Sequence, residues 1–138
     1  MNSVAGRVQV DFRSEEPLYL QIARQIEELV GNGTLQVGDQ LPTVREMAAE
    51  LSINFNTVAR AYRLLDESRI ISTQRGRGTY IWEKPTEETR HLLKEAALED
   101  VLLEMIARVE SRGYSFDEIL ETLQKIKREK RDKNQEIE

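Results

Sequence analysis

The stretch over residues 42–65 constrains the fold most, because its pattern predicts two short helices joined by a tight turn. Thr43 followed three residues later by Glu46 is a capping-box pattern, in which the two side chains satisfy backbone N–H groups at a helix start. One buried stripe of the first helix is formed by Met47, Ala48 and Leu51. Asn54 is a favoured N-cap for the second helix. The inner face of that helix carries Val58, Ala61, Tyr62 and Leu65.

The opposite face of the second helix is largely polar. At about 100° per residue, it presents Asn56, Ala59, Arg60 and Arg63. Amide and guanidinium groups are the side chains that hydrogen-bond base edges and phosphates in a major groove. The pattern therefore favours a helix-turn-helix, in which the first helix braces and the start of the second enters the groove. The alternative is a helical hairpin whose polar face is only solvated.

A second pattern follows directly. Residues 70–74 and 79–82 are rich in β-branched and aromatic side chains, as strands are. Between them lies Arg75-Gly76-Arg77-Gly78, which places glycines in a turn and arginines at its tip. A hairpin after a recognition helix is a wing, and an arginine at its tip can reach a narrow minor groove. The tetrapeptide alone is more typical of an ordinary turn, but its position after the helix pair favours nucleic-acid binding.

These motifs carry a family resemblance. Residues from about Phe12 to Trp82 resemble the winged-helix DNA-binding domain of the GntR family of bacterial transcription regulators. The matching runs are Pro17-Leu18-Tyr19-x-Gln21-Ile22, Gly38-Asp39-Gln40-Leu41-Pro42-Thr43-Val44-Arg45-Glu46, Asn56-Thr57-Val58-x-x-Ala61-Tyr62 and Gly76-x-Gly78-Thr79-Tyr80. The short C-terminal part resembles the YtrA-type subfamily, which carries only two helices after this domain. One departure is Phe55, where that subfamily often has proline.

The resemblance implies a sequence-specific DNA-binding transcription regulator, a repressor, and no enzyme is expected. Together with the dimer that the C-terminal segment predicts, as described below, the expected function is binding of an inverted-repeat operator as a homodimer. The rival function is a winged-helix protein–protein interaction module. An intrachain pair with Glu46 or Glu50 is the alternative role for Arg45, and capping alone would account for Asn54. The candidate DNA-binding residues are Thr43, Arg45, Asn54, Asn56, Thr57, Arg60, Arg63, Arg75, Gly76 and Arg77.

The predicted fold is mainly α with a small β-hairpin. It consists of an N-terminal winged helix-turn-helix and a two-helix C-terminal dimerisation segment. An amphipathic helix begins at Pro17, and residues 35–37 are expected to pair with the wing as a third, short strand. The predicted divisions are a flexible N-terminus over 1–11, the winged helix-turn-helix domain over 12–84, the dimerisation segment over 85–130 and a charged tail over 131–138.

The C-terminal segment predicts a dimer. A helix runs from Glu87 to Arg112 without glycine or proline, and a second one starts at the capping box of Ser115 and Glu118. The apolar stripe is too wide for the last helix alone to cover, which indicates a second copy of the chain. The alternative is that the stripe packs onto the chain's own winged domain. The candidate interface is Leu92, Leu93, Ala97, Val101, Leu102, Met105, Ile106, Val109, Leu120 and Leu123.

Composition limits the remaining classes. The net charge of −5 hides an asymmetry, because residues 56–78 sum to +3 and residues 85–138 to −4. With no cysteine and one histidine, neither a metal site nor a catalytic site is expected, and no cofactor. No apolar run is long enough to span a bilayer and no signal peptide is visible, so a cytoplasmic protein is expected. A small-molecule effector stays open and unidentified, as do the operator sequence and the regulated genes.

Overall fold

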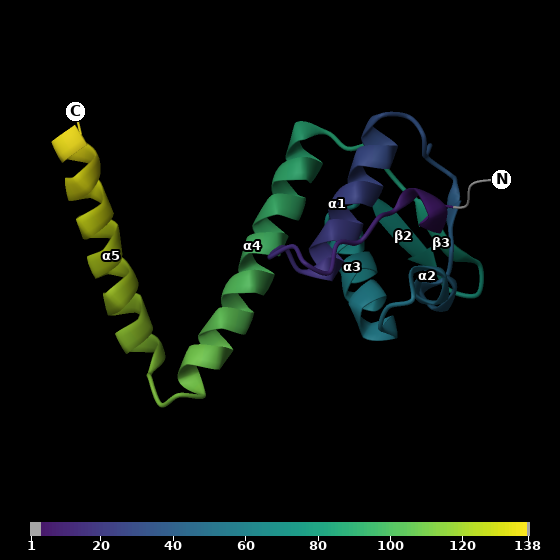
Figure 1. Cartoon of the computed structure of the whole chain (residues 1–138). Coiled ribbons are helices and arrows are strands. Elements are labelled where there is room, and N and C mark those ends of the chain that lie inside the picture. Colours follow the sequence, from purple (N-terminus) through teal and green to yellow (C-terminus); the bar gives the residue numbers. More distant parts are fainter. Residues whose placement is uncertain (1–3, 138) are drawn as a thin grey trace. The chain divides into compact units, whose positions relative to one another are not determined.

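The computed structural model describes residues 4–137 and divides the chain into two compact units, Met1–Ala97 and Leu98–Glu138 (Figure 1). The first unit holds a short 3-10 helix, three helices, a three-stranded sheet and the beginning of a fourth helix. In chain order, these elements are η1 (Ala5–Arg7), α1 (Leu18–Gly31), β1 (Gln40–Leu41), α2 (Val44–Leu51), α3 (Phe55–Glu67), β2 (Ile71–Gln74), β3 (Gly78–Ile81) and α4 (Glu87–Glu110). The predicted fold, mainly helical with an N-terminal winged helix-turn-helix, is confirmed.

The core of the first unit lies between α1, α3 and the sheet. The predicted inner face of α3 is buried at all four positions, and Leu64 is buried beside it. From α1, Ile22 and Ile26 are fully buried, and Met47 brings α2 onto the same core. Removing this apolar surface from water is the main force that holds the helices together. The core thereby fixes α2 and α3 as one rigid pair.

The sheet is antiparallel, in the order β1-β3-β2. The hairpin pairs Ile71 with Ile81 and Gln74 with Gly78. The third strand is β1, paired with β3 through Gln40 and Tyr80.

The third strand does not lie where the sequence predicted it, at residues 35–37. Instead, Leu35 is buried and donates its backbone N–H to the Leu29 carbonyl at 2.9 Å. A turn follows, in which the Gln36 N–H donates to the Asp39 carboxylate at 2.8 Å. The chain therefore reaches β3 only after this turn, where the Ile81 N–H donates to the Asp39 carbonyl at 2.8 Å.

The N-terminal segment is fastened to α1, which differs from the predicted flexible range 1–11; residues 1–3 of that range lie outside the described residues. Ala5 and Val8 are buried in the core. The buried Gln21 side chain accepts from the Asp11 N–H at 2.8 Å and donates to the carbonyls of Asp11 and Glu16, at 3.0 and 2.8 Å. Local sequence patterns did not indicate this attachment, because an amide side chain of α1 provides it.

The first turns of α4 belong to the first unit. Thr86 caps this helix, and its hydroxyl accepts from the Thr89 N–H at 3.2 Å. Leu93 is buried in the core, with Ala96 and Ala97 packed against it. The structure thus corrects the predicted dimer interface at Leu93, because this part of the stripe packs onto the chain's own winged domain.

An ion pair joins α4 to α1, where Arg90 Nε lies 3.3 Å from a Glu27 carboxylate oxygen. Burial raises the pKa of Glu27, while the nearby Arg90 charge opposes that rise. The cost of burying Glu27 offsets part of the attraction, so the pair adds little to the stability of the unit. Its role is to hold the start of α4 against α1.

The second unit contains the rest of α4 and helix α5 (Phe116–Ile137). Its predicted capping box is confirmed, since the Glu118 N–H donates to the Ser115 hydroxyl at 3.1 Å and the Ser115 N–H to the Glu118 carboxylate at 3.2 Å. Helix α5 continues through the predicted charged tail as far as Ile137. Lysine, arginine, glutamate and glutamine are all good helix formers. Within the described residues, no helix is long and apolar enough to cross a membrane.

Candidate nucleic-acid interface

The two helix starts of the helix-turn-helix are capped as the sequence predicts. The Thr43 hydroxyl accepts from the Glu46 N–H at 3.1 Å, and the Glu46 carboxylate accepts from the Thr43 N–H at 3.4 Å. At α3, the Asn54 side chain accepts from the Asn56 N–H at 2.7 Å. Each cap fixes the position at which its helix starts and satisfies a backbone N–H group there. A contact of Thr43 or Asn54 with DNA stays a prediction.

A buried tyrosine locks the two helices together. The Tyr62 hydroxyl on α3 donates to the carbonyl of Pro42, just before α2, at 2.6 Å. Burial raises the pKa of Tyr62, and the charge of Glu46 adds to the rise. The hydroxyl therefore stays protonated and keeps donating. This bond fixes the angle at which α3 leaves α2.

We expect Tyr62→Phe to lower the free energy of unfolding by about 1–2 kcal/mol, because the Pro42 carbonyl loses its donor in a half-buried place. Urea titration followed by far-UV circular dichroism measures the change. The matched control is Thr34→Val, which removes a hydroxyl at an exposed position of the same unit. Equal midpoints for the wild type and Tyr62→Phe would contradict this role.

The same tyrosine predicts a pH dependence. Its pKa in the folded chain lies above the ordinary value near 10, so at higher pH the unfolded chain releases the proton first. Stability contributed by neutral Tyr62 is complete below about pH 10 and falls as the pH rises beyond it. Tyr62→Phe should flatten this alkaline loss, which titrations at pH 9 and pH 11 would measure.

The outer face of α3 presents its polar side chains as predicted. Asn56 and Arg63 are exposed, and Thr57 is half-buried. At the far end of the same helix, Asp66 and Glu67 are also exposed. Carboxylates repel a phosphate backbone, so the part of α3 before them, as far as Arg63, is the part that suits a groove.

Arg60 has an intrachain partner. Its guanidinium carbon lies 3.9 Å from the centroid of the Tyr19 ring of α1. This is the distance of a close cation–π contact. The side chain therefore keeps its positive charge while packing α3 against α1. As a DNA contact, Arg60 stays a prediction.

Arg45, in the first turn of α2, lies beside Phe55, with its guanidinium carbon 5.8 Å from the ring centroid. The predicted alternative partner Glu46 has its carboxylate in the capping box. Phe55 is the first residue of α3 and is 47% exposed. Sequence reasoning treated it only as a departure from a family pattern. The signal was present, because an aromatic residue there lies outside the buried stripe.

The wing is a tight hairpin with its tip held from two sides. The Arg77 N–H donates to the Gln74 carbonyl at 2.9 Å, and Gly76 has a φ of 75°, which glycine adopts without strain. The Arg77 carbonyl accepts from the Tyr80 hydroxyl at 2.7 Å and from the Gln40 side-chain amide at 3.3 Å. These contacts leave Arg75, Gly76 and Arg77 exposed at the tip. The roles of Gln40 and Tyr80 were not foreseen from the sequence.

The close approach of Gln40 also explains the second glycine of the wing. A Cβ on Gly78 would lie 2.5 Å from the Gln40 amide nitrogen, and its φ is 113°. Side chains are strained in this region of backbone conformation. Glycine here lets the third strand support the tip.

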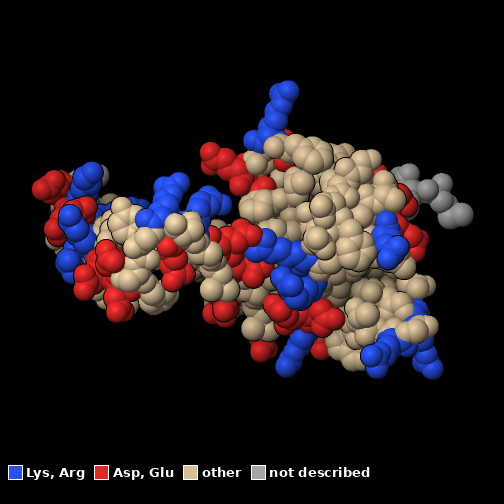
Figure 2. All heavy atoms as spheres, turned by 90° about the horizontal axis from the view of Figure 1, so that it is seen from below, with Lys and Arg blue, Asp and Glu red and all other residues tan. Residues whose placement is uncertain are grey.

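Charged side chains of both signs project from the winged part in Figure 2, and both signs also intermix along α5 at the left. The basic excess belongs to residues 56–78, which sum to +3. Within the described residues, no group of three or more histidine and acidic side chains is arranged to hold a metal ion. The surface suits a polyanion better than a small substrate.

Two capped helices followed by a hairpin with an arginine-bearing tip define a winged helix-turn-helix protein. Residues 18–81 match the family model described as bacterial regulatory proteins, gntR family. The transcriptional repressor YtrA of Bacillus subtilis strain 168 is 38% identical, over 86% of this chain and 91% of the relative. The chain therefore belongs to the GntR family, and its resemblance to the YtrA-type subfamily is confirmed.

Solved structures agree with this assignment. A YtrA of the GntR family from Sulfolobus acidocaldarius is 31% identical, with a TM-score of 0.53 over 88% of this chain and 97% of that one. A transcriptional antiterminator from Listeria monocytogenes EGD-e is 29% identical, with a TM-score of 0.55 over 86% of this chain and 88% of that one. The chain is thus a DNA-binding transcription regulator, and its family is not one of enzymes.

Proposed function

We propose that this chain represses transcription by binding an inverted-repeat operator as a homodimer. The observation that carries the proposal is that one compact unit presents both the polar outer face of α3, from Asn56 to Arg63, and the arginines of the wing. The first suits base edges and phosphates in a major groove, and the second suits a minor groove. Repression is supported by the Bacillus subtilis relative, which is a transcriptional repressor.

The homodimer is supported by the second unit. From residue 98 to residue 136, no described residue is buried. Large apolar side chains on both of its helices and in the loop between them stay 42–59% exposed; they are Leu98, Leu103, Met105, Tyr114, Phe116, Leu120, Leu123 and Ile126. A helix pair with this much exposed apolar surface does not form a core by itself.

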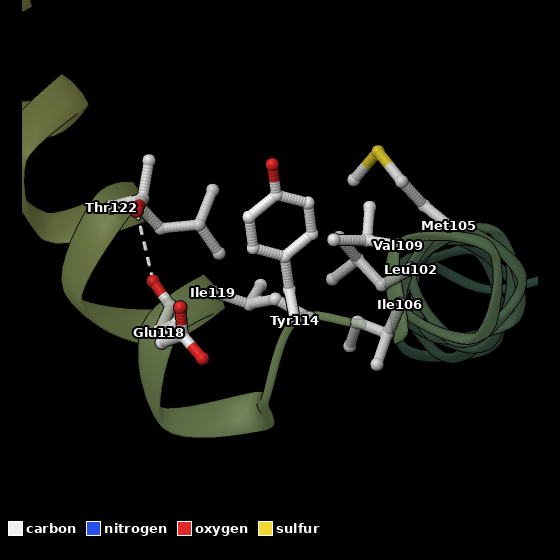
Figure 3. A pocket seen from close by; sticks show the side chains of 9 residues that line it. Leu102, Met105, Ile106, Val109, Tyr114, Glu118, Ile119 and Thr122 are labelled. Atoms are coloured by element: carbon white, nitrogen blue, oxygen red, sulfur yellow. Dashed lines mark hydrogen bonds between the residues drawn. The ribbon is translucent and has the colours of Figure 1, made fainter. Parts of the chain in front are cut away.

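A cavity within the second unit marks where the apolar surface gathers. It has a volume of about 380 Å³ and is lined mainly by apolar side chains. Figure 3 shows the Tyr114 ring between α5, with Thr122, and α4, with Met105 and Val109. Glu118 and Thr122 are joined by a hydrogen bond from the Thr122 hydroxyl to the Glu118 carbonyl at 2.9 Å. We propose that a second copy fills this space.

The interface that remains after the core has taken up Leu93 runs along α4 and α5. Its proposed members are Leu92, Ala97, Val101, Leu102, Met105, Ile106, Val109, Leu120 and Leu123. Two-fold symmetry would turn two winged units toward matching half-sites, so the operator would be an inverted repeat. We place this dimer in the cytoplasm, where its DNA is.

Regulation would act on the same arrangement. A signal that changes the spacing or mobility of the two winged units would release the operator. Such a signal must bind one arrangement of the two units better than the other. A small molecule is one such signal, and its identity is open.

Selection of bound fragments from a random duplex library tests the proposal, because the selected DNA gives the half-site and its spacing together. We expect an inverted repeat, binding that weakens steeply with salt, and a light-scattering mass of twice 16.0 kDa. A stably monomeric protein, or equal affinity for random duplex, would overturn it.

A further inference from the structure

The exposed ring of Phe55 lies at the start of α3, the helix that we propose enters the major groove. It is the first residue of α3, between the capping Asn54 and the exposed Asn56. In a helix-turn-helix, the N-terminal residues of the second helix are those that contact base edges. Nearly half of the Phe55 side chain is open to solvent, although burial of an aromatic ring is strongly favourable. The ring is therefore available to a surface that the chain does not itself provide.

The surroundings of Phe55 indicate what that surface is. A shallow groove at the helix-turn-helix is lined by Arg45, Ala48, Ala49, Ser52, Ile53 and Phe55. Its floor is apolar, and at one side stands the Arg45 guanidinium, 5.8 Å from the Phe55 ring centroid. A partner must therefore offer a small apolar group close to negative charge or hydrogen-bond acceptors. The 5-methyl group of thymine in a major groove has this combination, because guanine acceptors and phosphates lie beside it.

We infer that Phe55 reads a thymine in each half-site by packing its ring against the 5-methyl group. This inference rests on the proposed function and deepens it, since it adds a specificity-determining residue to the polar and basic ones. Arg45 contributes a positive charge beside the same base pair. The two side chains come from different helices, so the capped turn between them determines the spacing of the contact.

Deoxyuridine in place of thymine tests the inference, because it removes the methyl group and leaves base pairing intact. Each symmetric pair of thymines in the selected operator is replaced in turn, and affinities are measured for the wild type and for Phe55→Ala. One buried methyl group is worth about fourfold in affinity. At one position, we expect the wild type to lose about 15-fold over two half-sites and Phe55→Ala to lose less than twofold.

A second variant guards against a folding defect. Phe55→Pro also removes the ring, and proline suits the first position of a helix because its missing N–H has no intrahelical partner there. It should keep the wild-type circular dichroism and thermal midpoint, and should lose the same methyl dependence as Phe55→Ala.

The outcomes separate the two proposals. If the operator is bound but every uracil substitution weakens the wild type and Phe55→Ala equally, the thymine contact is overturned and the proposed function stands. If Phe55→Ala binds the thymine operator as tightly as the wild type, the contact is also overturned. If the wild type selects no duplex, the proposed function fails and this contact fails with it.

Discussion

A chain carrying Arg63→Ala and Arg75→Ala is expected to bind its operator at least about 1000-fold more weakly than the wild type at physiological salt. Each arginine in a DNA contact contributes about 1–3 kcal/mol to the free energy of binding. The proposed dimer loses two arginines from each of its winged units. Arg63 is exposed on the outer face of α3 and Arg75 at the wing tip. The substitutions therefore remove charge without opening the core.

A salt titration adds a second measurement. Each lost phosphate contact lowers the slope of log affinity against log salt by about 0.9, so the variant should show a shallower slope. The matched control is Lys130→Ala with Lys133→Ala on α5, which changes the net charge equally at exposed positions. An unchanged slope in the arginine variant would mean that neither side chain faces DNA. Arg60 is kept in both variants because it packs on Tyr19.

The second large effect concerns the assembly. We expect Met105→Glu with Leu123→Glu to convert the dimer into a monomer of 16.0 kDa. Both side chains line the apolar cavity of the second unit, and in a single chain each is more than 40% exposed. The carboxylates can be solvated in the monomer, whereas burying them in an apolar interface is costly. A monomer binds half-sites one at a time, so operator affinity should fall by about 100-fold or more.

Light scattering and operator titration measure the two parts of this result. Ala107→Glu with Gln124→Glu is the control, because both positions are exposed and neither lines the cavity. At about 100° per residue, Ala107 lies on the opposite side of α4 from Met105, and Gln124 is turned about 100° from Leu123 on α5. The control should stay dimeric with unchanged affinity. If the Met105 and Leu123 variant remains a dimer, the interface lies elsewhere on the chain.

Much of the fold could be predicted because local rules agree with tertiary packing. Capping boxes at Thr43 and Ser115 mark helix starts through bonds between neighbours in the chain, and both form as expected. The buried face of α3 follows from helical spacing alone. The wing follows from its glycines, whose backbone conformations belong to the turn itself.

What the sequence did not reveal depends on contacts between distant residues. Gln21 is buried because the segment over residues 11–16 presents backbone groups to its side chain. No local sequence pattern predicts this contact. Gln40 and Tyr80 hold the wing tip through a single carbonyl, which depends on the register of the sheet. Leu93 belongs to the apolar stripe that predicted the dimer interface. It is buried instead in the core of the first unit, because the first turns of α4 pack onto that core.

Phe55 and the arginines illustrate the same limit at the candidate site. Residue type and spacing indicated Asn56, Arg63 and the wing arginines, since amides and guanidinium groups are the common readers of DNA. An apolar reader has a weaker signature, which is an aromatic residue outside the buried stripe of its helix. Its exposure on the helix start has to be seen before it can be considered.

The stacking of Arg60 on Tyr19 has a consequence for how such a regulator can diverge. The cation that adds attraction for a polyanion also sets the tilt of the reading helix against its neighbour. Lysine at this position would keep the attraction but lose the flat stacking surface. The substitution Arg60→Lys would thus shift which sequence is preferred while the net charge is preserved. Binding strength and binding preference are, at this one residue, separable by evolution.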